Sequence, residues 1–463
     1  MAVDLSRLDE RALADHISSQ RWYGSKTREI AQVRMIDEVK LREHALPHCT
    51  GALVEVRFHE GTHDTYQLVL GARPADGAQA GAIGEVDGWM VYDALADPLL
   101  ARELVELMRA NATIEGGDGT LELRRIDGLD HFEHSFGNGR VVDAEQSNSS
   151  VVFGEELILK IYRRLEAGIN PELELLRFLT THDFPNIATL YGWTAYSGRP
   201  IDATLGLLQR FIANGVDGWD LALDSLSGDP DSFLSRIVRL GEVTGAMHTV
   251  LASDTSDPSF AVEESSIESL GLLVASVDEE IEQVFLDLPP ARDELAPIAG
   301  RGEEVREQLR LLSRVGSVGR VIRHHGDYHL GQVLWTGDDW VVIDFEGEPA
   351  RSLSERRQKR SPLRDVAGML RSFAYVASAA PLTRGVEPPP DFEQRARQQF
   401  LAGYYTTVDK ALLPAGEEAI NRLLSVFERE KAVYELRYEL ENRPDWVGIP
   451  VSGIDRLLQT TSA

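Results

Sequence analysis

Cysteine is nearly absent from this sequence. The single residue, Cys49, allows neither an internal disulfide nor a cysteine-based zinc site, and we expect an ordinary buried thiol. Long apolar runs are also missing, because no segment approaches the roughly 18 apolar residues of a membrane span. The first twenty residues mix acidic and basic side chains and do not resemble a signal peptide. These absences predict a cytoplasmic protein without a membrane segment.

Basic residues are scarce. Lys and Arg number 47 against 75 Asp and Glu, which makes the net charge −28. This balance argues against a nucleic-acid partner, because neutralising phosphates requires a basic face. A ligand that carries phosphate would have to bring a cation or find a local basic pocket.

The chain is long enough for two or three domains, because 463 residues exceed what one hydrophobic core usually serves. Residues 1–90 begin with helical spacing and continue with strand-like alternation in QVRMIDEV, LVEVRFH and TYQLVL. The stretch 71–88 is rich in Gly and Ala, and we expect it to form a loop. The following DPLLARELVELMRA is typical of a helix.

The rest of the chain changes character near residue 213. Residues 91–212 contain short strand-like runs such as TLELRRI, SVVF, LILKIY and TLGLLQRFI. Residues 213–463 contain long helical runs, interrupted only by QVLW and WVVIDF. We therefore predict an α+β fold with two lobes, a β-rich lobe at 91–212 and a helical lobe at 213–463. A ligand is expected in the cleft between such lobes.

The segment RHHGDYHLGQVLW, residues 323–335, concentrates polar chemistry. Asp327 and Gln332 lie five positions apart, and Asp344 ends the strand-like WVVIDF. Phosphoryl transfer needs a carboxylate that accepts the proton of the attacking hydroxyl, and oxygen ligands for Mg²⁺. These three residues supply those groups.

Zinc binding is a competing interpretation of the same segment. His324, His325 and His329 are possible ligands, but the i, i+4 pair requires a helix, and Gly326 and Gly331 favour a loop. We prefer a role for His325 in fixing the loop by hydrogen bonds. His329 is left open between a substrate contact and a structural role.

The β-rich lobe should supply a lysine for phosphates and a carboxylate that orients it. Lys160 lies inside the apolar strand LILKIY, and Glu174 on the following helix is the preferred partner, with Glu172 as the alternative. A lone strand lysine is more often a surface residue whose stem lies on apolar groups. The hairpin loop EQSNSS, residues 145–150, offers Ser147, Asn148 and Ser149 as donors to phosphates.

Several motifs together carry a family resemblance. They are HGDYHLGQVLW, VVIDFEGEPARSLSERRQKRSPLRDVAGMLRSFAY, EQSNSSVVF, LILKIYRRLEAGINPELEL, QRWYGSK and KAVYELRYELENRPDW. Through these motifs, which span nearly the whole chain, the sequence resembles the aminoglycoside-phosphotransferase-like kinases, and among them the maltokinases. The resemblance implies a protein-kinase-like fold with an N-terminal cap over residues 1–90.

The resemblance also implies an activity, which is ATP-dependent phosphorylation of maltose at the anomeric hydroxyl. The product, maltose 1-phosphate, would feed α-glucan (glycogen) synthesis, and a separate trehalose synthase is a candidate partner of this monomer or weak oligomer. By match to the motifs, Asp327 would be the base, Lys160 and Glu174 would serve the phosphates, and Gln209 and Phe211 would form the adenine hinge. Mg²⁺ would be held by Gln332, Asp344 and Glu346.

Sugar recognition is expected from the C-terminal segment EKAVYELRYELENRPDW. Glu435, Tyr438, Glu439 and Asn442 recur at i, i+3, i+4 and i+7 and share one helix face, with Arg443 and Trp446 just beyond it. Carboxylates bind sugar hydroxyls and aromatic rings stack on pyranoses. The alternative is a solvated, salt-bridged helix face. ENRPDW lacks the basic residues that several maltokinases carry before RPxW.

Other functions remain open at this stage. A kinase for another sugar, such as glucosamine, fits the same scaffold, and an acidic pocket would suit its ammonium group. An aminoglycoside substrate is disfavoured by the extra N-terminal segment. A pseudokinase or binding module is disfavoured by the intact set of Lys160, Asp327 and Asp344.

Overall fold

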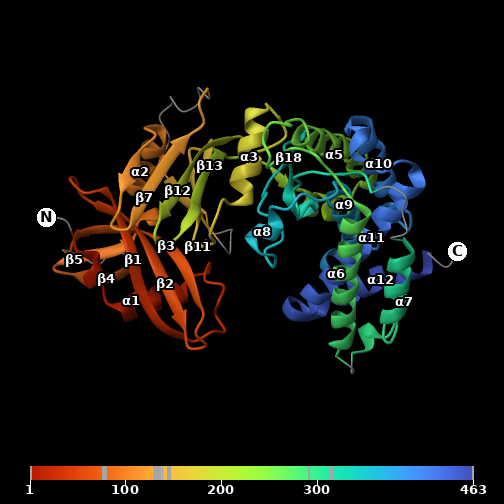
Figure 1. Cartoon of the computed structure of the whole chain (residues 1–463), viewed down its shortest axis with the longest axis horizontal. Coiled ribbons are helices and arrows are strands. Elements are labelled where there is room, and N and C mark those ends of the chain that lie inside the picture. Colours follow the sequence, from red (N-terminus) through yellow and green to blue (C-terminus); the bar gives the residue numbers. More distant parts are fainter. Residues whose placement is uncertain are drawn as a thin grey trace. The chain divides into compact units, whose positions relative to one another are not determined.

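The computed structural model describes residues 3–75, 81–128, 137, 139–142, 148–289, 292–312 and 318–460. The chain divides into two compact units. The N-terminal unit comprises Met1–Thr180 and Ala188–Ala213, and the C-terminal unit comprises Thr181–Ile187 and Asn214–Ala463. Each unit is labelled by element in Figure 1.

The first sheet of the N-terminal unit is antiparallel and has the order β1-β2-β3-β5-β4. Its strands are β1 (Ile30–Arg42), β2 (His48–Phe58), β3 (His63–Pro74), β4 (Ala82–Val86) and β5 (Trp89–Asp93), and α1 (Glu10–Ser19) packs against it (Figure 1). The prediction of a loop over residues 71–88 is wrong at both ends of that stretch. Its first residues belong to β3, which runs to Pro74, and residues 82–86 form β4, which pairs with β5. Residues 76–80 of that stretch lie outside the described residues.

The core of this sheet lies under α1. Leu13 and Ile17 of the helix are buried together with Val54 and Tyr66 of the strands. This is the face that the helical spacing of the first segment predicts. Cys49 is buried in β2, which confirms the expectation of an ordinary buried thiol.

The second sheet has seven strands in the order β6-β7-β12-β13-β10-β9-β8. They are β6 (Thr113–Glu115), β7 (Gly119–Arg125), β8 (Gly139–Val142), β9 (Asn148–Phe153), β10 (Leu157–Tyr162), β12 (Leu190–Gly198) and β13 (Asp202–Arg210). The helices beside them in sequence are α2 (Pro98–Arg109) and α3 (Pro171–Thr181). The sequence analysis missed β12, whose LYGWTAYSG mixes Gly, Ser and aromatics.

The two sheets of this unit are tied together by specific contacts. Strand β11 (Arg164–Leu165), which follows β10 of the second sheet along the chain, pairs with β3 of the first sheet. The side-chain amide of Gln67 donates to the carbonyls of Tyr162, at 2.8 Å, and of Leu205. The predicted boundary at residue 90 falls inside β5, and the division of the chain into three domains stays a prediction.

The C-terminal unit is mainly helical, as predicted. Its helices are α4 (Gly218–Leu226), α5 (Pro230–Leu251), α6 (Ile267–Leu286), α7 (Gly302–Leu312), α8 (Leu353–Arg356), α9 (Leu363–Arg384), α10 (Phe392–Thr407), α11 (Glu417–Asn442) and α12 (Gly448–Thr460). Its short strands are β14 (Val216–Asp217), β15 (Glu263–Glu264), β16 (Arg320–Val321), β17 (Val333–Trp335) and β18 (Trp340–Val342). Helices α5 and α10 approach so closely that a Cβ atom at Gly403 would clash with the Val238 carbonyl oxygen.

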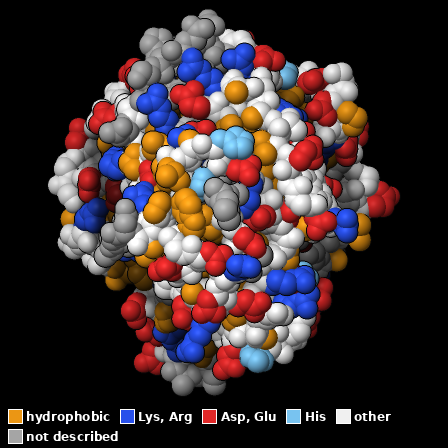
Figure 2. All heavy atoms as spheres, turned by 90° about the vertical axis from the view of Figure 1, so that its left-hand side faces the viewer, with side chains coloured by type: hydrophobic (Ala, Val, Ile, Leu, Met, Phe, Trp, Pro, Cys, Tyr) orange, Lys and Arg blue, Asp and Glu red, His pale blue; other side chains and the backbone are white. Residues whose placement is uncertain are grey.

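Among the described residues, no helix combines the length and the apolar character that crossing a membrane would require. Acidic and basic side chains are interspersed over the face shown in Figure 2.

Candidate active site

The loop between β16 and β17 is held by a buried aspartate. Asp365, in the first turn of α9, accepts hydrogen bonds from the backbone N–H groups of His325 (2.8 Å) and Gly326 (2.9 Å). His248 on α5 contacts the same carboxylate at 3.2 Å. Burial alone would raise the pKa of Asp365, but the neighbouring histidines and these hydrogen bonds bring it well below its usual range. Asp365 therefore fixes the loop as an anion.

Two histidines of the loop are structural. His325 donates from Nε2 to the Ile343 carbonyl at 3.0 Å, and its Nδ1 accepts the Asp327 backbone N–H at 3.4 Å, which confirms the predicted role in fixing the loop. Burial lowers the pKa of His324 to about 3, so this ring is neutral. Within the described residues, the histidines of this loop do not gather as a metal-ligand group, which removes support for zinc.

The Asp327 carboxylate contacts a partly buried lysine. Lys431 on α11 donates from Nζ to Asp327 Oδ1 and to Glu348 Oε1, both at 2.9 Å. Burial would raise the pKa of Glu348, but Lys431 and Arg351 outweigh it and lower that pKa to about 2. Burial would likewise lower the pKa of Lys431, yet the two carboxylates raise it above its ordinary value. The sequence analysis missed Lys431 and Glu348.

His329 lies on the other side of Asp327. Its Nε2 is 3.9 Å from Asp327 Oδ2, and its Nδ1 accepts the backbone N–H of Gly331 at 3.1 Å. The pKa of His329 is lowered, because the surrounding protein removes its hydration. A neutral ring that accepts at Nδ1 carries its proton on Nε2, so it presents a donor next to Asp327.

Oxygen donors suited to Mg²⁺ lie at the two ends of the β17–β18 hairpin, because Gln332 directly precedes β17 while Asp344 and Glu346 follow β18. Gln332 Nε2 donates to Asp344 Oδ2 at 3.1 Å, which leaves the amide oxygen of Gln332 as an acceptor. One carboxylate oxygen of Glu346 lies within 4.8 Å of one of Asp344. Asp344 has φ +59°, a left-handed backbone conformation that is uncommon for a non-glycine residue but that aspartate adopts more readily than most. Carboxylate and amide oxygens fit the hard Mg²⁺ ion.

A cavity of about 470 Å³ opens beside Asp327 within the C-terminal unit. Most of the predicted sugar-binding residues line it, namely His329, Glu435, Tyr438, Glu439, Arg443 and Trp446. Asn442 is not among the lining residues; it is exposed and donates to the Tyr438 carbonyl of its own helix at 2.9 Å, and its role in sugar binding stays a prediction. Further lining residues that the sequence analysis missed are Trp219, Tyr375, Lys431 and Tyr434.

Aromatic rings form part of the cavity wall. Tyr375 stacks on Trp446 with ring centroids 6.1 Å apart and contacts Trp219 at 5.8 Å. The Arg443 guanidinium lies over the Trp446 ring, 4.9 Å from its centroid. These rings come from α4, α9 and the segment after α11, so no local sequence pattern brings them together.

The carboxylates that line the cavity are paired with cations. Arg371 contacts Glu435 through Nη2 at 2.6 Å, and Arg443 contacts Glu439 at 2.7 Å. The Tyr375 hydroxyl also donates to Glu439. Burial raises the pKa of Tyr375 further above its usual range. The cavity is therefore polar but close to charge balance.

In the N-terminal unit, Lys160 is buried in β10, as its apolar strand predicts. Its Nζ donates to Glu172 Oε2 at 2.9 Å, and the Tyr162 hydroxyl donates to the same oxygen at 2.7 Å. The alternative partner, Glu172, therefore contacts the lysine, and the role of the preferred partner, Glu174, stays a prediction. Both glutamates are buried in the first turn of α3.

The predicted phosphate loop is shorter than expected. Ser147 lies outside the described residues, whereas Asn148 and Ser149 belong to strand β9 rather than to a loop. The Ser149 hydroxyl accepts a hydrogen bond from Arg163 Nε at 2.8 Å. A phosphate role for Asn148 and Ser149 stays a prediction, and it would have to act from a paired strand.

The predicted hinge is partly engaged within its own sheet. Gln209 lies in β13, where it pairs with Ile158 on one side and with Leu190 on the other. The backbone N–H of Phe211 donates to the Glu156 carbonyl at 2.7 Å. Of the Phe211 backbone groups, the carbonyl is then the one left for adenine, and the hinge role stays a prediction.

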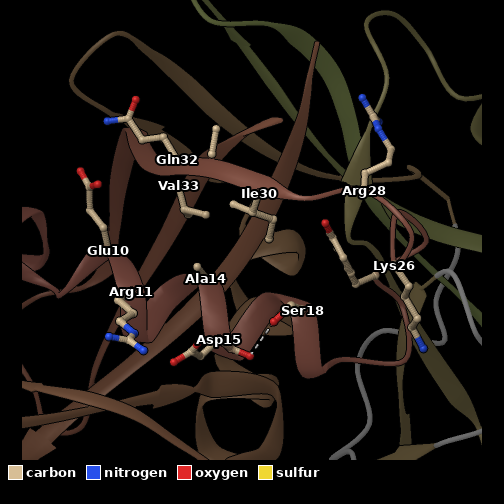
Figure 3. A pocket seen from close by; sticks show the side chains of 12 residues that line it. Glu10, Arg11, Ala14, Asp15, Ser18, Lys26, Arg28, Ile30, Gln32 and Val33 are labelled. Carbon is tan, nitrogen blue, oxygen red and sulfur yellow. Dashed lines mark hydrogen bonds between the residues drawn. The ribbon is translucent and has the colours of Figure 1, made fainter. Parts of the chain in front are cut away.

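A second cavity lies in the first sheet of the N-terminal unit, between α1 and β1, and has a volume of about 630 Å³ (Figure 3). Charged side chains of both signs line it, among them Arg11, Asp15 and Lys26. The Ser18 hydroxyl donates to the Asp15 carbonyl at 3.2 Å, within the helix. None of the residues assigned to catalysis lines this groove, although it is larger than the cavity at Asp327.

Comparison with known proteins agrees with this geometry. Residues 138–387, more than half of the chain, match the Phosphotransferase enzyme family, and residues 16–97 match the maltokinase N-terminal cap domain. The chain therefore belongs to this phosphotransferase family, the aminoglycoside-phosphotransferase-like kinases, and carries a maltokinase-type cap. The predicted family and fold class are confirmed.

Curated relatives are named glucosamine kinases. One, from Streptacidiphilus jiangxiensis, is 28% identical over 333 residues, which is 69% of this chain and 73% of that protein. Another, from Mycolicibacterium smegmatis, is 24% identical over 338 residues, covering 69% and 79%. A solved glucosamine kinase in complex with glucosamine, ADP and inorganic phosphate has a TM-score of 0.70 at 20% identity over 96% of this chain and 98% of that chain. The solved structure shows the shared fold.

Proposed function

We propose that this protein is an ATP-dependent kinase that phosphorylates maltose at its anomeric hydroxyl, giving maltose 1-phosphate and ADP. The observation that carries the proposal is the cavity where Asp327, bonded to Lys431, lies with the predicted sugar-binding face of α11. The cap match over residues 16–97 supports the maltokinase branch of the family.

The charge balance of the cavity supports an uncharged acceptor. Among the described lining residues, Glu435 pairs with Arg371, Glu439 with Arg443, and Asp327 with Lys431. An ammonium group would gain little from carboxylates that are already neutralised, and it would be repelled by the nearby cations. Sugar hydroxyls both donate and accept, so they can bond to either member of each pair.

The aromatic wall supports an acceptor larger than one pyranose. Trp219, Tyr375 and Trp446 line the cavity as rings that contact one another, and Tyr434 and Tyr438 line the same cavity. Amphipathic rings suit the apolar faces of sugars while leaving hydroxyls to polar partners. A disaccharide can contact more of these aromatic rings than glucosamine can.

The proposed reaction uses each polar group in one role. Asp327 Oδ2 accepts the proton of the anomeric hydroxyl, while Lys431 holds Oδ1 and fixes the carboxylate. His329 donates from Nε2 to the acceptor oxygen or to Asp327. Lys160, oriented by Glu172, binds the phosphates of ATP. Gln332, Asp344 and Glu346 would hold Mg²⁺, which would neutralise phosphate charge during transfer.

Glucosamine is the second candidate acceptor. The names of the curated relatives favour it, at 28% and 24% identity. A free carboxylate in the cavity would have strengthened this candidate, and the observed ion pairs weaken it. The predicted partnership with trehalose synthase and the route to α-glucan depend on maltose being the acceptor.

A coupled ADP-release assay tests the proposal. Purified protein with Mg-ATP would be offered maltose, glucosamine, glucose and kanamycin, and ³¹P NMR would identify the product. We expect turnover with maltose and a phosphate on the anomeric carbon. Preferred turnover of glucosamine would reject maltose, and absence of turnover with every acceptor would favour a binding module.

A further inference from the structure

The two cation partners of the cavity glutamates differ in how firmly they are held. Arg443 is about half exposed, at 47% for its side chain, and itself lines the cavity. Arg371 on α9 is 4% exposed and lies behind Glu435, outside the cavity lining. Arg443 can turn toward a ligand, whereas Arg371 has no such freedom.

The position of Arg371 is set by packing as well as by charge. It contacts Glu435 at two points, Nη2 to Oε2 at 2.6 Å and Nε to Oε1 at 3.4 Å. The guanidinium lies against Gly453 of α12, where an added Cβ would be 2.6 Å from both terminal nitrogens. A planar guanidinium that meets a carboxylate at two points keeps that carboxylate neutralised.

Glu435 is the member of this pair that faces the cavity. Its side chain is 13% exposed, and it lines the cavity together with Asp327 and Tyr438. With Arg371 in place, the pair presents hydrogen-bonding oxygens without a net charge. Without Arg371, the same oxygens would present a partly buried negative charge, which an ammonium group would neutralise.

We propose that Arg371 determines acceptor specificity: by neutralising Glu435 from behind, it makes the cavity select uncharged sugars over amino sugars. This inference rests on the proposed function, because it assumes that the cavity at Asp327 binds the acceptor. Arg371 acts through Glu435 and does not touch the sugar, so it is a specificity-determining residue rather than a catalytic one.

The test compares glucose and glucosamine, which differ by one hydroxyl or ammonium group. The measured quantity is the acceptor ratio, defined as kcat/KM for glucosamine divided by kcat/KM for glucose. We expect Arg371→Gln to raise this ratio at least tenfold at a pH where the amine is protonated. The increase should fade as the amine loses its proton at higher pH, which a purely structural effect would not produce. An unchanged ratio in folded Arg371→Gln protein overturns the inference.

Two further variants keep the test decisive if Arg371→Gln does not fold. Glu435→Gln leaves the cation uncompensated, and Arg371→Gln/Glu435→Gln removes both charges. The acceptor ratio should be lower in Glu435→Gln than in the double variant, and equal ratios would overturn the inference. Failure of the proposed function shows separately, as preference for glucosamine over maltose in the wild-type protein.

Discussion

Two lysines, one in each unit, have carboxylate partners at the same distance; Lys160 is buried and Lys431 is partly buried. Lys160 donates to Glu172 at 2.9 Å, and Lys431 donates to both Asp327 and Glu348 at 2.9 Å. The sequence analysis found the first and missed the second. Lys160 interrupts an apolar strand, where a charge is conspicuous, whereas Lys431 lies in EREKAVYELRYELE among many charges.

The contrast between Lys160 and Lys431 shows that a functional charge is hard to recognise in a segment with many other charges. A charged residue in a helix rich in Glu and Arg is typical of a solvated face. The structure buries Glu430, Lys431's neighbour, as well as Glu439 further along α11, because α11 packs against α9. The burial of α11 converts an ordinary charge pattern into a set of ion pairs around Asp327.

The largest effect is expected from the carboxylate that Lys431 holds. Asp327→Asn should lower kcat about 100- to 10,000-fold, because an amide cannot accept the proton of the acceptor hydroxyl. Nucleotide affinity, measured by calorimetry with ATP, should change little. Normal turnover by this variant would contradict the assignment of the base.

Replacing each lysine separately sharpens the comparison. Lys160→Met should weaken ATP binding by about 10- to 100-fold, the loss expected for a charge-assisted contact to phosphate. Lys431→Met should reduce kcat while leaving the KM for ATP nearly unchanged. Steady-state kinetics with varied ATP concentration would separate the effect on ATP binding from the effect on turnover. An equal rise in the KM for ATP in both variants would contradict these different roles of Lys160 and Lys431.

The pH dependence of stability tests the Lys431 site. The pKa of Glu348 is about 2 in the folded protein, below its ordinary value of 4.5. The ion pairs of Glu348 therefore contribute their full stabilisation at pH values above about 4.5. The stabilisation is lost as pH falls from about 4.5 to about 2, and amounts to roughly 3 kcal/mol. Lys431→Met should therefore be less stable than wild type at pH 7, with a gap that narrows in this acid range. Urea unfolding at several pH values measures it, and a constant gap would contradict the pairing.

The smallest effect separates two residues near the end of α11. Trp446→Ala should raise the KM for maltose about tenfold, equivalent to about 1.4 kcal/mol, because it removes a ring from the cavity wall. Asn442→Ala is the matched control, since its side chain bonds only to its own helix among the described contacts. A similar rise in KM for both variants would contradict the cavity as the acceptor site.

Much of the site could be predicted from local patterns. Asp327, Gln332 and Asp344 lie within one short span around two strands, and the loop glycines argue against zinc. The face of α11 follows from helical spacing, and most of it lines the cavity. The exceptions were residues whose role depends on partners far along the chain, such as Arg371, Tyr375 and Trp219.

The sequence by itself determined the family and the fold class, because the motifs that carry them depend on spacing and residue type. The catalytic and metal-binding roles of the loop residues stay predictions. Only the tertiary structure decided that Lys160 donates to Glu172, and that the side chain of Asn442 bonds to its own helix instead of lining the cavity. It also decided that Lys431 bonds to both Asp327 and Glu348. The physical reason is that tertiary packing sets a side chain's partner and its burial. Lys431 is 104 positions from Asp327 and 83 positions from Glu348, and no local periodicity encodes contacts at that separation.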